Sequence, residues 1–127
     1  MTQEVLEMKS ILKSFLIMNA LALAQMAAAA DVSGTWKMSI EMQAGTSSPV
    51  FVLTQKGETI TGNYKGEFGE APVIGTIKGN DLSLAYRTEV QGVPLDVTYT
   101  GTVEGNTMSG KLLLVGFGDG TFKGIKQ

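Results

Sequence analysis

The chain has 127 residues, no Cys, no His, 16 Gly and a formal net charge of -2. Without a thiol or an imidazole it cannot build Ser-His or Cys-His nucleophilic machinery, a structural Cys/His zinc site or an iron–sulfur cluster, because the groups that would deprotonate or coordinate are missing. The slightly acidic balance, with no basic run, also argues against binding to a nucleic-acid backbone. The length suits one domain, and the composition narrows the function to binding.

Residues 1–30 have the three parts of a signal peptide. Lys9 and Lys13 precede an uncharged run, 15–30, which ends in alanines and is followed at once by Asp31. This order of basic, apolar and small residues predicts a signal peptide that is cleaved after Ala30. The alternative is an uncleaved anchor, but a run of about 16 residues is shorter than the roughly 20 that cross a bilayer core.

The residues before Met8 fit a signal peptide poorly, since Glu4 and Glu7 put negative charge where export signals are basic. A true start at Met8 would remove both acids. With either start, the mature domain is predicted to span residues 31–127, to be exported to the periplasm or the cell exterior, and to keep no stable membrane span. Because it has no Cys, a packed core must hold it together in place of disulfides.

The mature region has apolar residues at every second position, interrupted at short intervals by turn residues, which predicts successive strands. The first strand is predicted over 36–42, where Trp36, Met38, Ile40 and Met42 alternate with polar residues. The further predicted strands are 49–56, 59–67, 71–78, 81–90, 93–104, 107–115 and 121–126. Short connections favour antiparallel neighbours, and closure removes both exposed edges. The predicted fold is therefore all-β: an eight-stranded antiparallel up-and-down meander closed into a small barrel, preceded by a signal-peptide helix.

The connections of this meander are of two kinds. Three tight turns share one pattern of charge, Gly, polar, polar, apolar and hydroxyl residues, and they begin at Lys56, Lys78 and Glu104. Alternate turns of a meander fall at the same end, so these three lie with both termini at what we call the closed end. The open end carries 44–48, 68–70, 91–92 and 116–120. A binding site at a barrel mouth is expected there.

Strand parity predicts an interior without charge. The predicted inward side chains are Trp36, Met38, Ile40, Met42, Phe51, Leu53, Ile60, Tyr64, Val73, Ile77, Leu82, Leu84, Tyr86, Leu95, Val97, Tyr99, Val103, Met108, Leu112, Leu114 and Phe122. So many large residues favour a filled interior over a hollow one. Any ligand would have to be small and largely apolar, because burying an unpaired charge is costly.

Gly34-Thr35-Trp36, Thr61-Gly62-x-Tyr64 and a last strand that bears Lys123 resemble the calycin group, which comprises lipocalins and avidins. In that group a Gly-x-Trp opens the barrel, and a basic side chain of the last strand packs over the indole near the closed end. The resemblance implies that Gly34 and Trp36 form a plug with Lys123 or Lys126 against the ring. Biotin binding is not predicted, because the chain has one Trp and lacks the Asn and Ser that follow this motif in avidins. The chain is also similar to small exported bacterial domains without an assigned activity.

The resulting hypothesis is an exported, non-catalytic barrel that binds a small, largely apolar ligand at its open end. The alternative is an interaction or structural module with a filled core that docks on a periplasmic or extracellular protein. No enzyme, cofactor or metal is expected, since no two carboxylates have a catalytic spacing. The rings of Phe68 and Phe117 are the leading site candidates, although both could simply cap the barrel. The candidate ligand- or partner-binding residues are Ser47, Ser48, Phe68, Glu70, Phe117 and Asp119.

Overall fold

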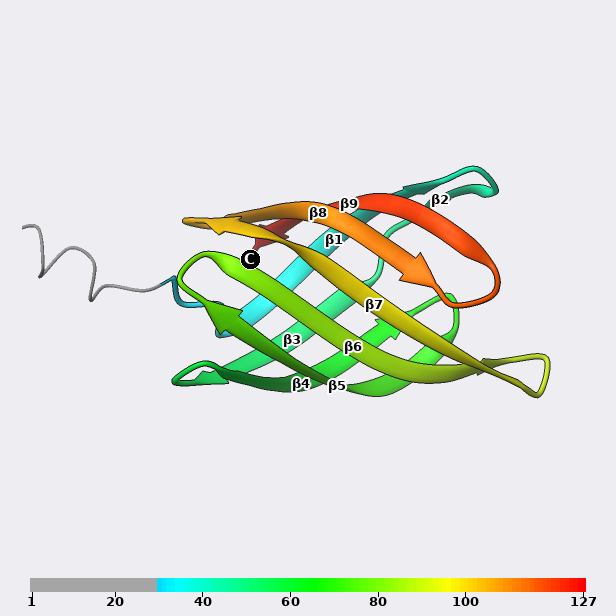
Figure 1. The fold of residues 1–127 in the computed structure, drawn as a ribbon, viewed down its shortest axis with the longest axis horizontal. Coiled ribbons are helices and arrows are strands. Elements are labelled where there is room, and N and C mark those ends of the chain that lie inside the picture. The colour runs from blue at the N-terminus through cyan, green and yellow to red at the C-terminus, as the bar shows by residue number, and fades with distance from the viewer. Residues whose placement is uncertain (1–29) are drawn as a thin grey trace, which may run out of the picture.

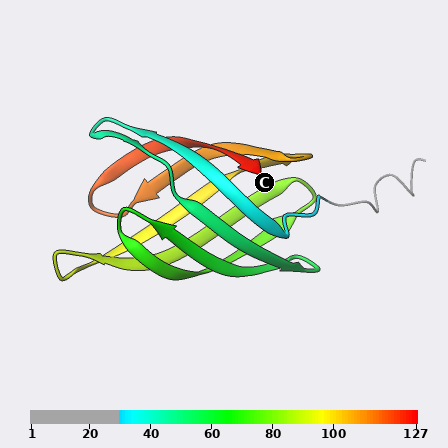
Figure 2. The same ribbon diagram turned by 180° about the vertical axis from the view of Figure 1, so that it is seen from behind.

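The computed structural model describes residues 30–127, so the predicted signal peptide and the alternative start at Met8 lie outside the described residues. The strands are β1 (Gly34–Met42), β2 (Gly45–Ser47), β3 (Val50–Lys56), β4 (Thr59–Gly66), β5 (Gly69–Lys78), β6 (Asp81–Val90), β7 (Val93–Glu104), β8 (Thr107–Leu114) and β9 (Gly118–Lys126). All pairings are antiparallel, and β1 also pairs with β9, which closes the sheet into a barrel (Figure 1). Figure 2 shows the two closing strands from behind.

The segments β2 and β3 are two parts of one barrel strand. Both pair with β1 in the same register, since Ile40 lies opposite Ser47 and Lys37 lies opposite Val50. The ladder is interrupted at Pro49, which has no N–H to donate, although its carbonyl still accepts a bond of 2.9 Å from the Met38 amide. The predicted eight-stranded, closed antiparallel barrel is therefore confirmed for the described residues.

Three predicted loop segments at the open end are shorter than expected, because strands extend into them. Ser47 lies in β2, Glu70 lies in β5 and Asp119 lies in β9. The predictions of residues 44–48, 68–70 and 116–120 as loops were therefore wrong in part. The reason is that glycines at 45, 69 and 118 continue the ladders with positive φ, where the sequence pattern had indicated turns.

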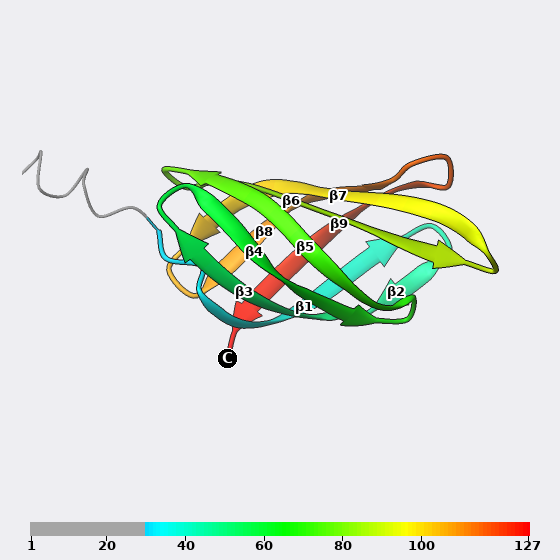
Figure 3. The same ribbon diagram turned by 90° about the horizontal axis from the view of Figure 1, so that it is seen from below.

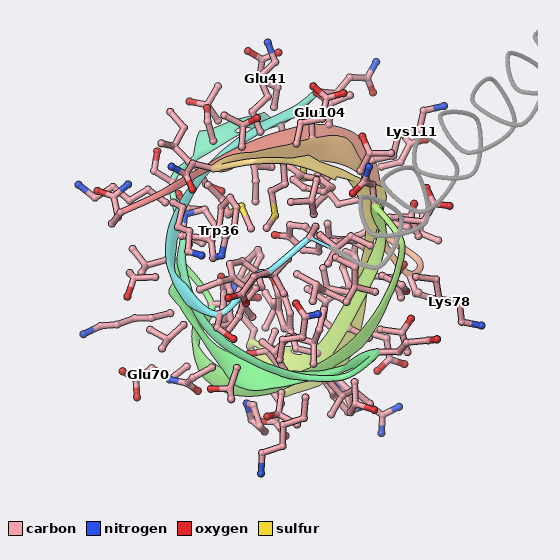
Figure 4. All side chains as sticks on the ribbon, turned by 90° about the vertical axis from the view of Figure 1, so that its left-hand side faces the viewer. Trp36, Glu41, Glu70, Lys78, Glu104 and Lys111 are labelled. Atoms are coloured by element: carbon pink, nitrogen blue, oxygen red, sulfur yellow. The ribbon has the colours of Figure 1, made fainter. Side chains whose placement is uncertain are left out.

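Side-chain alternation agrees with the predicted interior. Every predicted inward residue is buried except Met42, which is partly buried, and the core also contains Val32, Ala71 and the polar Thr88. Figure 4 looks along the barrel and shows Trp36 inside the ring of strands, while the labelled Glu41, Glu70, Lys78, Glu104 and Lys111 point outward. The period of two in the sequence thus separates an apolar interior from a charged exterior.

A pair of inward glycines lets two neighbouring strands approach closely. Gly101 on β7 lies directly opposite Gly110 on β8. A Cβ at Gly101 would collide with the carbonyl oxygen of Ser109, and a Cβ at Gly110 would collide with that of Thr100. Only glycine fits both positions, so this pair allows a sharp local bend of the barrel wall.

The closed end is plugged by the segment that precedes β1. Val32 is fully buried, its carbonyl accepts a bond of 2.9 Å from the Trp36 indole Nε1, and its amide donates to Gln55 Oε1 at 2.9 Å. The Ser33 hydroxyl in turn accepts a hydrogen bond from the backbone N–H of Gln55. Trp36 itself has no exposed surface, so this end of the barrel is filled.

Of the two lysines predicted beside the indole, Lys126 occupies this position, and Lys123 does not. The Lys126 ammonium lies 6.0 Å from the Trp36 ring centroid and donates to the Asp31 carbonyl at 3.3 Å. Lys123 is exposed on the outer face of β9 because it has the opposite parity. Gly34 has a φ of +134°, and a Cβ there would lie 2.9 Å from Lys126 Cε. The glycine of the Gly-x-Trp motif therefore leaves room for the lysine stem that covers the ring.

Replacing Trp36 with Ala should lower the free energy of unfolding by about 3–5 kcal/mol, because it empties a fully buried site and removes the bond to Val32. Urea denaturation of residues 31–127 measures this loss. Ile125→Ala is the matched control, since this apolar side chain of β9 is 60% exposed and its truncation should change stability by about 0.5 kcal/mol or less. A loss below about 1 kcal/mol for Trp36→Ala would contradict the plug.

Candidate functional site

The open end of the barrel is formed by turns 43–44, 67–68, 91–92 and 115–117. In Figure 3 these turns lie at the end opposite the segment that leads into β1. No segment comparable to the one containing Val32 crosses this end among residues 30–127. The two ends therefore differ: one is plugged by chain, and the other is accessible.

A cavity of about 350 Å³ lies at the open end. Apolar side chains and the rings of the three tyrosines form most of its lining, and the polar members Glu67, Thr46 and Ser47 come from the rim. The lining residues are Ile40, Met42, Ala44, Gly45, Thr46, Ser47, Tyr64, Glu67, Phe68, Tyr86, Tyr99, Leu112, Leu114 and Phe117. The interior is thus filled around the plug, and a cavity lies at the open end, whereas the sequence favoured a filled barrel over a hollow one.

The structure brings half of the predicted site residues to this cavity. Ser47, Phe68 and Phe117 line it, with Phe68 partly buried and Phe117 60% exposed. Ser48 is exposed at the interruption between β2 and β3 and does not line it. This separation follows from parity, because Ser47 and Ser48 are neighbours with opposite orientations.

The other two predicted site residues, Glu70 and Asp119, do not line the cavity. Both are exposed on strands. The Glu70 carboxylate lies 3.8 Å from the Lys65 ammonium on the neighbouring strand, which places it on the outer wall. Asp119 lies opposite the outward-facing Leu113 of β8. Neither can reach the cavity, since a strand residue of this parity cannot point into the barrel.

Sequence reasoning identified Tyr64, Tyr86 and Tyr99 as inward residues but not as site residues. The rings of Tyr64 and Tyr86 stack with centroids 4.2 Å apart and an interplanar angle of 13°. Phe51 packs edgewise against all three tyrosines, with centroid distances of 5.5, 6.0 and 5.2 Å to Tyr64, Tyr86 and Tyr99. The sequence did contain a signal for them. Three tyrosines occupy inward-facing positions on strands whose other inward residues are almost all apolar.

The hydroxyls of these tyrosines differ in their partners. Tyr64 Oη accepts a long bond of 3.4 Å from the Phe68 amide. Tyr99 has no exposed surface, and within residues 30–127 its hydroxyl is the one buried side-chain polar atom without a hydrogen bond of ordinary distance and angle. Its nearest polar neighbour is the phenol of Tyr86, which interacts with it only weakly. Burial, and then the neighbouring phenols, raise the pKa of Tyr86, and burial raises that of Tyr99. Both side chains are therefore neutral at physiological pH and able to donate a hydrogen bond.

The turn that carries Phe68 is tied to β6, the neighbour of β5 in the sheet. The Thr88 hydroxyl, on β6, donates a bond of 2.9 Å to the Phe68 carbonyl. Thr88 is buried at 9% exposure, so this bond is protected from water. The bonds from Thr88 and to Tyr64 together hold the Phe68 turn at the mouth of the cavity.

The hydrogen-bond ladder of the barrel wall is interrupted beside this turn. The ladder between β5 and β6 stops at the pair Ile74 and Ala85. The Ile77 backbone amide donates to the Glu58 carbonyl, on the β4 side of β5. Successive backbone amides of a strand point alternately to its two neighbours, so the backbone nitrogen of residue 72 faces β6. Position 72 is a proline, which has no N–H to donate, and this explains why the ladder ends there.

An outer groove of about 450 Å³ lies over this part of the wall, and Tyr86 lines both the groove and the inner cavity. Arg87 and Asp96 border the groove and form a two-point ion pair, with N–O distances of 2.7 and 3.1 Å. This Arg87 hydrogen bond lowers the pKa of the Asp96 carboxyl. Both groups are exposed, so we assign the pair a local bracing role between β6 and β7 rather than a large share of the stability.

In the part of the chain that the structure describes, no three carboxylates come together as a group that could hold a metal ion. None of residues 30–127 forms a helix of the length and hydropathy needed to span a membrane. Against known proteins, the chain matches no family model and no curated sequence. Fold and cavity therefore define its class: a small closed antiparallel β-barrel, plugged at one end and hollow at the other.

Replacing Thr88 with Val should destabilise the protein by about 1 kcal/mol, because the Phe68 carbonyl loses its hydrogen-bond donor. It should also speed amide hydrogen exchange at Phe68, whose turn is no longer held. Exchange measured by NMR and urea denaturation test both effects. Thr98→Val is the control, since Thr98 is exposed on the outer face of β7. Equal exchange at Phe68 in the two variants would show that the Thr88 bond does not hold the turn.

Proposed function

We propose that the protein is an exported, non-catalytic barrel that binds a small, largely apolar ligand in its open-end cavity. The observation that carries this proposal is the cavity of about 350 Å³ with its apolar and aromatic lining. Small-molecule sites commonly have about 300–1,000 Å³ and an apolar lining with a few polar groups. A barrel that only needed a stable core would gain from filling this space, because unfilled volume costs packing energy.

The size of the cavity suits a compact ligand of one or two fused rings. The aromatic side chains of Phe68 and Phe117 at the mouth would cover the ligand after it enters, and the exposed ring of Phe117 would lose water contact on binding. Burying such apolar surface contributes about 25 cal/mol per Å². The two rings are therefore the residues expected to add most to affinity at the rim.

Kinship with the calycin barrels is part of the proposal. It is supported by the plug, in which Gly34 makes room for the stem of Lys126 and the ammonium lies over Trp36. It is also supported by the position of the cavity at the end remote from that plug. In this arrangement a ligand would enter at the open end, along the barrel axis.

Export is the second part of the proposal, and it rests on the order of residues in 1–30. The hydrogen bonds of the plug that the structure describes use the carbonyl of Asp31 and the amide of Val32, so a mature chain that starts at Asp31 would keep them. It would lose only the packing of Ala30 against the core among the contacts of residues 30–127.

Expression of the full chain in a bacterium should release a product that begins at Asp31, as measured by intact mass and N-terminal sequencing. Ala28→Arg should block cleavage, because signal peptidase accepts only small residues at this position of the A-x-A site. Ala29→Arg is the matched control and should still be processed, since the middle position is unrestricted. An uncut wild-type chain, or a cut elsewhere, would contradict this prediction.

The alternative function, docking on a partner protein, also has an observation in its favour. Leu113, Val115 and Phe117 follow one another at alternate positions near the open end and are 47%, 51% and 60% exposed. Exposed apolar side chains that gather on one surface often mark an interaction site. The two functions differ in what Phe117 contacts: a ligand in the cavity, or the surface of another protein.

The fluorescent probe N-phenyl-1-naphthylamine should bind to residues 31–127 with a stoichiometry of one. Phe117→Ala should weaken binding by about fivefold, which corresponds to roughly 1 kcal/mol of lost apolar contact, and Phe68→Ala should have an effect in the same direction. Ile125→Ala is the matched control, because Ile125 is as exposed as Phe117 but lies on β9 away from the cavity. Absence of probe binding, or equal binding by all variants, would overturn the proposed site and favour the docking module.

A further inference from the structure

We infer that the ligand is a neutral molecule that presents a hydrogen-bond acceptor, such as a carbonyl or ether oxygen, to the hydroxyl of Tyr99. This inference rests on the proposed function and names the chemistry of its ligand. It begins from one unusual group: a buried phenol that lines the cavity and makes no hydrogen bond of ordinary distance and angle, with the Tyr86 phenol as its only polar neighbour.

A buried polar atom without a partner is costly, and native proteins rarely keep one. Leaving such a group unpaired costs about 1–3 kcal/mol, and roughly 90% or more of buried polar groups have a partner. Phenylalanine at this position would keep the ring contacts with Phe51 and Phe122, which lie at 5.2 and 5.0 Å, without that cost. The hydroxyl of Tyr99 therefore serves something other than the packing of the ring.

The lining of the cavity excludes an anion as the matching group. No Lys or Arg lines it, and the one charged lining residue is Glu67 at the rim. A carboxylate or phosphate group beside Tyr99 would be buried without a counter-charge and would have to pass Glu67 on its way in. A neutral acceptor avoids both penalties.

A cation is also disfavoured, in spite of the aromatic lining. A quaternary ammonium binds against open ring faces. Tyr64 and Tyr86 stack on each other with nearly parallel planes, so each has one face covered by the other, and Phe51 packs against both. The rings are thus arranged as a wall for a flat apolar group and not as an open cage.

The test uses four probes on one ring system: naphthalene, 2-acetonaphthone, 2-naphthoate and (2-naphthylmethyl)trimethylammonium. Calorimetric titration of residues 31–127 should show 2-acetonaphthone binding about tenfold more tightly than naphthalene, which corresponds to about 1.4 kcal/mol. Both charged probes should bind more weakly than the ketone. Tighter binding of either charged probe would overturn the inference.

Tyr99→Phe should remove the tenfold advantage of the ketone and leave naphthalene binding unchanged. In the unliganded protein this variant should be as stable as the wild type or more stable, because it deletes an unpaired buried hydroxyl. Tyr64→Phe is the matched control: it should lower the melting temperature, since it removes the acceptor of the Phe68 amide, and it should keep the preference for the ketone.

The outcomes separate this inference from the proposed function. If naphthalene and the ketone both bind in a Phe117-dependent way but Tyr99→Phe keeps the tenfold ratio, the inference is wrong and the binding site stands. Destabilisation of the unliganded protein by Tyr99→Phe would also overturn it, because the hydroxyl would then already have a partner. If no probe binds, the proposed function itself fails.

Discussion

The pairing of β1 with β9 is the constraint on which the rest of this structure depends. It runs from Trp36 opposite Lys126 to Met42 opposite Gly120 and joins the two ends of the folded chain. In a chain without disulfides, this seam must be held by its own hydrogen bonds and by the side chains that it encloses. It also brings Lys126 beside the segment that carries Asp31 and Val32, so closure of the barrel and plugging of its end form one cooperative unit.

The difference between the two halves of the barrel follows from this unit. At the closed end, Val32 and Trp36 are fully buried, and the Trp36 indole N–H donates to the Val32 carbonyl. At the open end no segment of the described chain folds inward. The rings of Phe51, Tyr99 and Phe122 pack at centroid distances of 5.2 and 5.0 Å, and the cavity lies on the side of this cluster that faces the mouth. A filled half thus supplies the stability that allows the other half to stay hollow.

Polar groups near the mouth appear where the fold needs a link that the ladder does not provide. Pro72 ends the ladder between β5 and β6, and the Thr88 hydroxyl then connects β6 to the Phe68 turn across the gap. Tyr64 supports the same turn from inside. Tyr99 differs from both, because its hydroxyl has no hydrogen bond of ordinary geometry and approaches only the phenol of Tyr86. This contrast between polar groups that hold the turn and one without a well-formed bond is the basis for assigning Tyr99 to the ligand.

The sequence by itself determined the strands, their order and the apolar interior, because these depend on local alternation and on turn residues. The pattern from Trp36 to Met42, and the glycines after Lys56, Lys78 and Glu104, act within a few residues and can be read directly. Only the tertiary structure decided that Lys126 and not Lys123 covers Trp36, that Glu70 and Asp119 face outward, and that the tyrosines line a cavity. Those facts depend on the register between strands of the closed barrel and on how side chains from distant strands pack together. Neither can be deduced from a short stretch of the chain.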